Sequence, residues 1–75
     1  MFHSIEFRVA ILVDLETTPA NWLEQLLILQ GTRLQAQVQP YVVETGQGPV
    51  EVADLFFGDG TATRGLPLAF FSFVD

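Results

Sequence analysis

The side chains best suited to catalysis are few in this chain of 75 residues. His3 is the only histidine, and a nucleophilic triad would require its ring to contact a hydroxyl such as that of Ser4 or Ser72, with a carboxylate behind it. Neither serine stands in a Gly-x-Ser-x-Gly sequence, which is typical of one large class of serine hydrolases. We interpret His3 as a solvated terminal residue and expect neither catalytic residues nor enzyme activity.

Carboxylates are the other group that could do chemistry. Asp14 and Glu16 would share one face of a strand, and two carboxylates in different environments can divide acid and base roles. The simpler interpretation is a solvated strand face. Asp59 stands alone between two glycines, whereas a calcium loop supplies roughly six to eight oxygens, and Asp-Gly is typical of a tight turn. Because cysteine is absent as well, we expect neither a metal nor a cofactor.

Arginine and aromatic residues instead favour binding. Arg64 could pair with Asp54 or Asp59 across a hairpin, or it could anchor a partner, because arginine and aromatic residues are enriched at interface hot spots. The phenylalanines cluster late in the chain, at 56–57 and at 70–73. Alternation along a strand places neighbours on opposite faces, so rings are expected on both faces of the sheet. The predicted protein interface consists of Trp22, Phe57, Arg64, Phe71 and Phe73.

The elements that position these residues follow from hydrophobic periodicity. From residue 5 to residue 15 every second side chain is apolar, which predicts a half-buried strand. Thr18 and Pro19 then resemble a helix start, and Gly31 is a natural helix stop. The apolar face of this predicted helix consists of Trp22, Leu23, Leu26 and Leu27.

The rest of the chain predicts strands. Residues 34–39 alternate, and Pro40 implies a bend, a bulge or a sheet edge because proline has no backbone N–H. Residues 50–57 predict a strand, 58–60 a turn and 61–74 a return strand. Gly65 and Pro67 should interrupt this return as a bulge or corner.

The expected fold class is α+β with the order β-α-β-β-β: a small, mostly antiparallel sheet with one helix packed on one face. A crossover through the helix would set the first two strands parallel. The alternative is a small SH3-like or Sm-like β-barrel with a helical insertion. The turn Gly-Asp-Gly followed by Thr-x-x-Arg-Gly resembles the tight, bent hairpins of such barrels.

Composition narrows the classes of function. The length predicts one domain, residues 1–75. The net charge of −6 would repel nucleic acid, and the chain contains no stretch suited to membrane insertion or to a signal peptide, so cytoplasm is the expected location. Hydrophobic residues make up 49% of the chain and charged residues 16%, which is much apolar surface for one small domain to bury.

These features predict a non-enzymatic protein–protein interaction module. It would be a small acidic adaptor, assembly or regulatory subunit that homodimerises or docks on a larger complex through an aromatic sheet surface. Two alternatives stay open at this point. One is a module that binds a small apolar ligand, and the other is an acidic mimic that blocks a nucleic-acid-binding protein.

Overall fold

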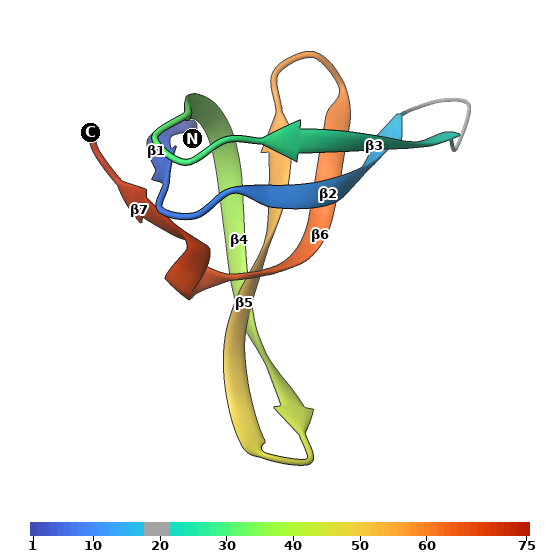
Figure 1. Ribbon diagram of the computed structural model, residues 1–75, viewed down its shortest axis with the longest axis vertical. Helices are drawn as coiled ribbons and strands as arrows, with labels where there is room; N and C mark the ends of the chain where they lie inside the picture. Colours follow the sequence, from blue (N-terminus) through green and yellow to red (C-terminus); the bar gives the residue numbers. More distant parts are fainter. Residues whose placement is uncertain (18–21) are drawn as a thin grey trace.

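Antiparallel strands make up 72% of the protein (Figure 1). The structure, a computed structural model, describes residues 1–17 and 22–75, with residues 22 and 23 described as backbone only. The strands are β1 (His3–Phe7), β2 (Ile11–Thr17), β3 (Trp22–Ile28), β4 (Arg33–Thr45), β5 (Gly48–Phe57), β6 (Thr61–Pro67) and β7 (Phe71–Phe73). A single 3-10 turn, η1 (Leu68–Phe70), separates β6 from β7.

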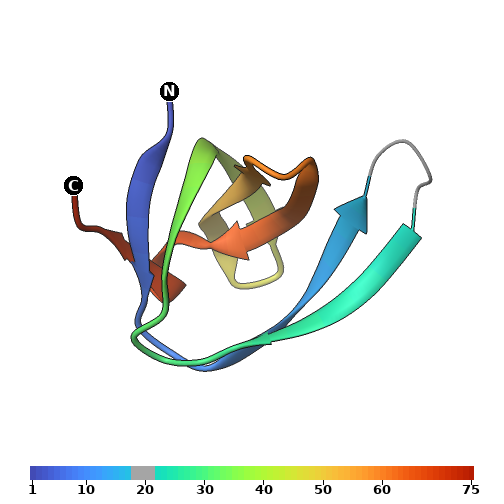
Figure 2. The ribbon, with the colours of Figure 1, turned by 90° about the horizontal axis from the view of Figure 1, so that it is seen from above.

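The strands form one seven-stranded sheet in the order β3-β2-β6-β5-β4-β1-β7. Each neighbouring pair is antiparallel, and the sheet curls into a half-barrel. Figure 2 shows the β2–β3 hairpin bending away from the remaining strands. The curled sheet therefore has two edges, β3 and β7.

The predicted α+β fold is wrong, because the described residues contain no α-helix. The segment expected as the helix forms β3, which pairs with β2 along its whole length, from Trp22 opposite Thr17 to Ile28 opposite Ile11. A short apolar run satisfies helical and strand periodicity alike, and here the backbone hydrogen bonds offered by β2 decide the outcome. The helical insertion of the barrel alternative is wrong for the same reason. The expected helix start at Thr18 and Pro19 lies outside the described residues.

The expected parallel pairing is also wrong. Without a crossover helix, β1 pairs with β4 antiparallel, His3 lying opposite Ala36. The single strand expected over residues 5–15 divides at a bend at residues 8–10 into β1 and β2. Phe7 and Val13, on either side of the bend, are both buried, whereas Val9 within the bend is exposed. One amphipathic pattern thus supplies two strands to the same concave face.

The core fills the concave face of the sheet. Its buried residues are Ile5, Phe7, Val13, Ile28, Ala36, Ala53, Leu55, Leu66 and Phe71. These residues come from every strand of the sheet, so the core depends on the curl rather than on a second layer. A single curved sheet covers only its inner side, and much apolar surface on the β2–β3 hairpin and on the far end of β4–β5 stays exposed.

A bulge in β6 keeps that core continuous. Leu55 lies opposite Thr63 and Ala53 opposite Leu66, so two residues, Arg64 and Gly65, face the single residue Asp54. Gly65 has φ +69°, a left-handed conformation that favours glycine. The extra residue returns Leu66 to the concave side, where it is buried. The interruption predicted at Gly65 is confirmed.

The β4–β5 hairpin projects beyond the body of the protein as an arm, here defined as residues 41–51 (Figure 1). β4 contacts β1 only from Arg33 to Ala36, so further along the strand its hydrogen-bonded neighbour among the described residues is β5. Pro40 lies in this region, where proline is tolerated because one side of the strand has no neighbour. Of the bend, bulge or edge predicted at Pro40, the structure shows the edge.

Candidate protein-interaction surface

The predicted interface residues are distributed over different parts of the molecule. Phe71 is buried in the core at 4% exposure, whereas Phe73 is 53% exposed at the edge strand β7. Phe57 is half-buried on the concave face. Arg64 lies on the opposite, convex side, and the side chain of Trp22 lies outside the described part of the structure. Of the four whose side chains the structure describes, Phe71 and Phe73 contact each other, 6.0 Å between ring centres, whereas Phe57 and Arg64 lie elsewhere on the sheet.

A different surface is apolar and open: the β2–β3 hairpin. Leu12 and Leu27 lie directly opposite each other on its convex face and are 56% and 59% exposed. Leu26, on the face of Val13, and Leu29, just beyond the end of β3, are exposed as well. We call Leu12, Leu26, Leu27 and Leu29 the hairpin leucines. Apolar side chains are thus uncovered on both faces of one hairpin, at one edge of the sheet.

A groove lies beside this hairpin on the concave side. Its apolar lining comes from Leu15 and Leu26 of the hairpin and from Leu34 and Phe57 of the opposite wall, and its volume is about 310 Å³. Asp59, in the turn after Phe57, lies at its rim. We call this space the mouth groove, because it lies where the half-barrel stays open. Here a predicted interface residue, Phe57, and one of the hairpin leucines, Leu26, line the same space.

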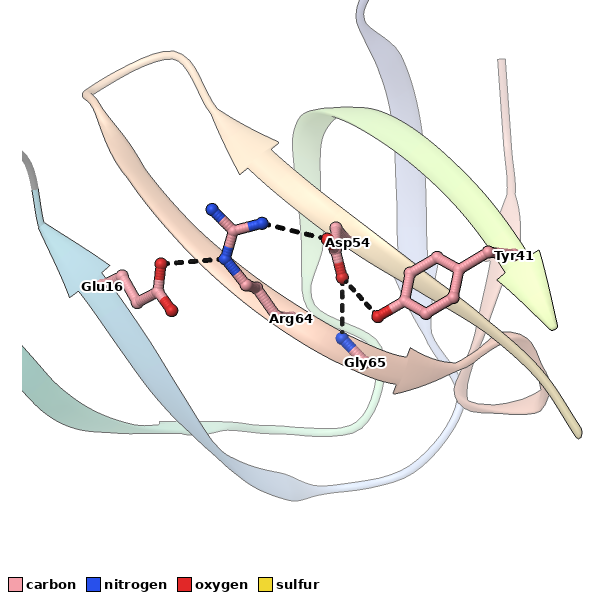
Figure 3. Close-up of polar contacts among 5 residues, drawn as sticks. All are labelled: Glu16, Tyr41, Asp54, Arg64 and Gly65. Carbon is pink, nitrogen blue, oxygen red and sulfur yellow. Dashed lines mark hydrogen bonds and ion pairs between the residues drawn. The ribbon is translucent and has the colours of Figure 1, made fainter. Parts of the chain in front are cut away.

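A polar network occupies the convex face near Arg64 (Figure 3). Arg64 Nε donates to Glu16 Oε2 at 2.9 Å and Nη1 donates to Asp54 Oδ2 at 3.0 Å. Tyr41 donates its hydroxyl to Asp54 Oδ1 at 2.8 Å, and the Gly65 backbone N–H donates to the same oxygen at 2.9 Å. The guanidinium also lies 5.4 Å from the centre of the Phe56 ring. The pairing of Arg64 with Asp54 that the sequence predicted is confirmed.

Asp54 is the centre of this network. Its side chain is only 16% exposed, and burial alone would raise the pKa of its carboxyl. The hydrogen bonds from Tyr41, Gly65 and Arg64 outweigh burial and hold the pKa below the ordinary aspartate value. Through these three contacts one carboxylate joins the arm, the bulge of β6 and, by way of Arg64, strand β2. We therefore assign the network to holding strands in register rather than to chemistry.

The lowered pKa of Asp54 predicts a pH dependence of stability. A group whose pKa is depressed by folding stabilises the protein above the ordinary value, near pH 4, and loses that effect as the pH falls toward the folded value. Acid also relieves repulsion among the excess carboxylates, which changes the stability of the whole protein. The contribution of Asp54 is therefore measured as the difference between wild type and a variant that lacks its carboxylate. We expect the free-energy difference between wild type and Asp54→Ala, measured by urea unfolding, to shrink between pH 7 and pH 3. A constant difference would contradict this role.

The termini carry a smaller contact. The Asp75 carboxylate accepts the Ser4 backbone N–H at 3.1 Å and lies 3.2 Å from His3 Nδ1. The Ser4 bond is the main reason that the pKa of Asp75 is lowered. The His3 ring also packs edge-on against Phe73, 5.2 Å between centres. The contact joins the two ends of the chain at β1 and β7.

In residues 1–17 and 22–75, no three histidine, cysteine or acidic side chains lie where they could hold a metal ion together. The same part of the chain forms no helix long and apolar enough to cross a bilayer.

Comparison with known proteins adds no assignment. No family model, curated protein or solved structure matches this chain significantly. The surface must therefore be interpreted from its own residues. Sequence reasoning missed the hairpin leucines, because it placed Leu26 and Leu27 on the buried face of a helix. The sequence does carry a signal that could have found them: Leu12 falls on the polar side of the first alternating stretch.

Proposed function

We propose that this protein is a non-enzymatic, cytoplasmic interaction module that self-associates or docks on a larger complex through the β2–β3 hairpin. The observation that carries the proposal is the exposure of Leu12 and Leu27, paired on the convex face of an edge hairpin. Contiguous apolar surface of this kind usually marks an interface. The proposal moves the predicted aromatic interface to leucines, with Phe57 contributing from the mouth groove.

The hairpin leucines lie beside a sheet edge that lacks the usual protection. Soluble proteins protect an edge strand with charges, proline or bulges, because an edge exposes unpaired backbone groups to other chains. β3 holds one charged residue, Glu24, and no proline. Burial of a leucine side chain stabilises a complex by about 1.5–3 kcal/mol, so a partner that covers two or three of them gains a substantial driving force.

The proposal is tested by light scattering and by binding of an apolar dye to the folded protein. We expect wild type to bind dye, to exceed monomer mass as its concentration rises, or to do both. The double variant Leu12→Ser/Leu27→Ser should lose most of the signal. The matched control Val9→Ser/Val74→Ser changes two other exposed apolar residues and should keep it. A wild-type protein that stays monomeric and binds no dye would overturn the proposal.

A small apolar ligand is the second candidate. The mouth groove has a volume of about 310 Å³ and four apolar lining residues, at the lower end of the range of ligand pockets, about 300–1,000 Å³. Native mass spectrometry of freshly purified protein would reveal a bound ligand as additional mass. A homogeneous apo mass would argue against this candidate and leave the interaction module unaffected.

A further inference from the structure

The free edge of β3 lies next to the mouth groove, and this arrangement indicates how a partner would bind. β3 is seven residues long and, in the described part of the chain, pairs with β2 alone. Its outer side therefore presents backbone donors and acceptors to an incoming strand. The other edge strand, β7, has only three residues, and the part of β4 that pairs with β5 alone, residues 37–45, contains Pro40 and does not line the mouth groove.

The mouth groove would receive side chains of such a strand. Leu26 belongs to β3 and also lines the groove, so the edge and the groove are continuous. An added strand points alternate side chains to the two faces of the sheet, and those on the concave face would enter between Leu26, Leu34 and Phe57. The occupant should therefore be extended and apolar at alternate positions.

The charges around the mouth groove indicate which charge the occupant should carry. Glu24 lies opposite Leu15 on the groove side of the hairpin and is exposed, and Asp59 lies at the groove rim. Two of the three arginines of the chain bind carboxylates elsewhere: Arg33 binds Glu6 at 2.8 Å, and Arg64 binds Glu16 and Asp54.

The net charge of the whole chain is −6. A second copy would bring the same excess of carboxylates to the edge, whereas lysine or arginine would complement it.

We propose that β3 binds an extended segment of a basic partner protein, which adds as a strand and places apolar side chains in the mouth groove. This inference rests on the proposed interaction function and specifies its partner. Backbone pairing with β3 would provide affinity, and the groove and the carboxylates would provide specificity.

The test uses a synthetic seven-residue peptide that alternates lysine with leucine, matched in length to β3. We expect this peptide to shift the backbone amide NMR signals of β3, with an affinity that falls as salt is added. A peptide with glutamate in place of lysine should bind at least about tenfold more weakly, a difference of about 1.4 kcal/mol. Methylation of alternate backbone nitrogens of the lysine–leucine peptide should abolish binding when the methylated nitrogens are those that would pair with β3.

Protein variants locate the site. Leu26→Thr removes apolar surface from the groove while keeping a residue suited to a strand, and it should weaken binding about fivefold or more. The matched control Val42→Thr changes an exposed apolar strand residue of the arm, outside both the groove lining and the hairpin leucines, and should leave affinity unchanged. Glu24→Gln should reduce both affinity and its salt dependence.

The outcomes separate the two proposals. Equal binding of the glutamate peptide, shifts confined to other strands, or no binding would overturn the basic-strand inference. If β3 amides shift with protein concentration alone, the occupant is a second copy, and only the inference fails. If no peptide binds and wild type also neither binds dye nor self-associates, the interaction function fails as well.

Discussion

Replacement of Phe71 by alanine should lower the free energy of unfolding by about 3–5 kcal/mol. The Phe71 ring is 4% exposed and packs against Phe7, 6.2 Å between ring centres, and its backbone pairs with that residue in β1. A domain of this length is expected to have a total stability of roughly 4–11 kcal/mol, so the loss should remove a large share of it. Urea unfolding followed by circular dichroism measures the change.

Phe73→Ala is the matched control, two residues along the same strand. Its ring is 53% exposed, so its loss should cost no more than about 1 kcal/mol. Equal unfolding midpoints for the two variants would show that Phe71 is not part of the core. The contrast also matters for function: a loss of binding in a Phe71 variant would report unfolding, whereas Phe73 can be changed without that ambiguity.

The second large effect is expected at Asp54. Asp54→Ala removes the acceptor for the Tyr41 hydroxyl, the Gly65 N–H and the Arg64 guanidinium, and it should cost about 2–3 kcal/mol. All three donors lose the carboxylate, and the bonds that fix the bulge at Gly65 and tie it to the arm are lost together. The thermal unfolding midpoint should fall by several degrees.

Two variants make this test specific. Tyr41→Phe removes one hydrogen bond and keeps the carboxylate, so it should cost about 1 kcal/mol or less. Asp14→Asn changes an exposed carboxylate of β2 and should stay within about 0.5 kcal/mol of wild type. If Asp54→Ala were no more destabilising than Asp14→Asn, the network would have no role in holding the bulge.

The polar network also explains why Arg64 was difficult to interpret from sequence. An arginine beside glycine and several phenylalanines fits an interface anchor and an internal ion pair equally well. The structure places it between Glu16 and Asp54, which are 48 and 10 residues away in sequence. Neither its exposure nor these exposed ion pairs, each worth about 0–1 kcal/mol, excludes a contact with a partner, so its predicted interface role remains a prediction.

Local chemistry alone was sufficient for much of the second half of the chain. The hairpin of β5 and β6 follows from two alternating stretches around Gly58-Asp59-Gly60, and Asp59 closes the turn by accepting hydrogen bonds from the Thr61 N–H and hydroxyl. The bulge follows from Gly65, because glycine adopts φ +69° without strain. The surplus of apolar side chains was equally evident, and the structure leaves leucines and valines exposed.

Only the tertiary structure decided that residues 22–28 form a strand, and which apolar side chains of the sheet stay uncovered. The apolar run of β3 fits the periodicity of a helix as well as that of a strand. Its pairing with β2, in which Leu27 lies opposite Leu12, makes it a strand. Likewise, Phe71 and Phe73 have the same parity, yet the first is buried and the second exposed. Periodicity assigns a side chain to one side of its own strand. Whether that side is covered depends on the curl of the whole sheet, which arises from contacts between residues far apart in the chain.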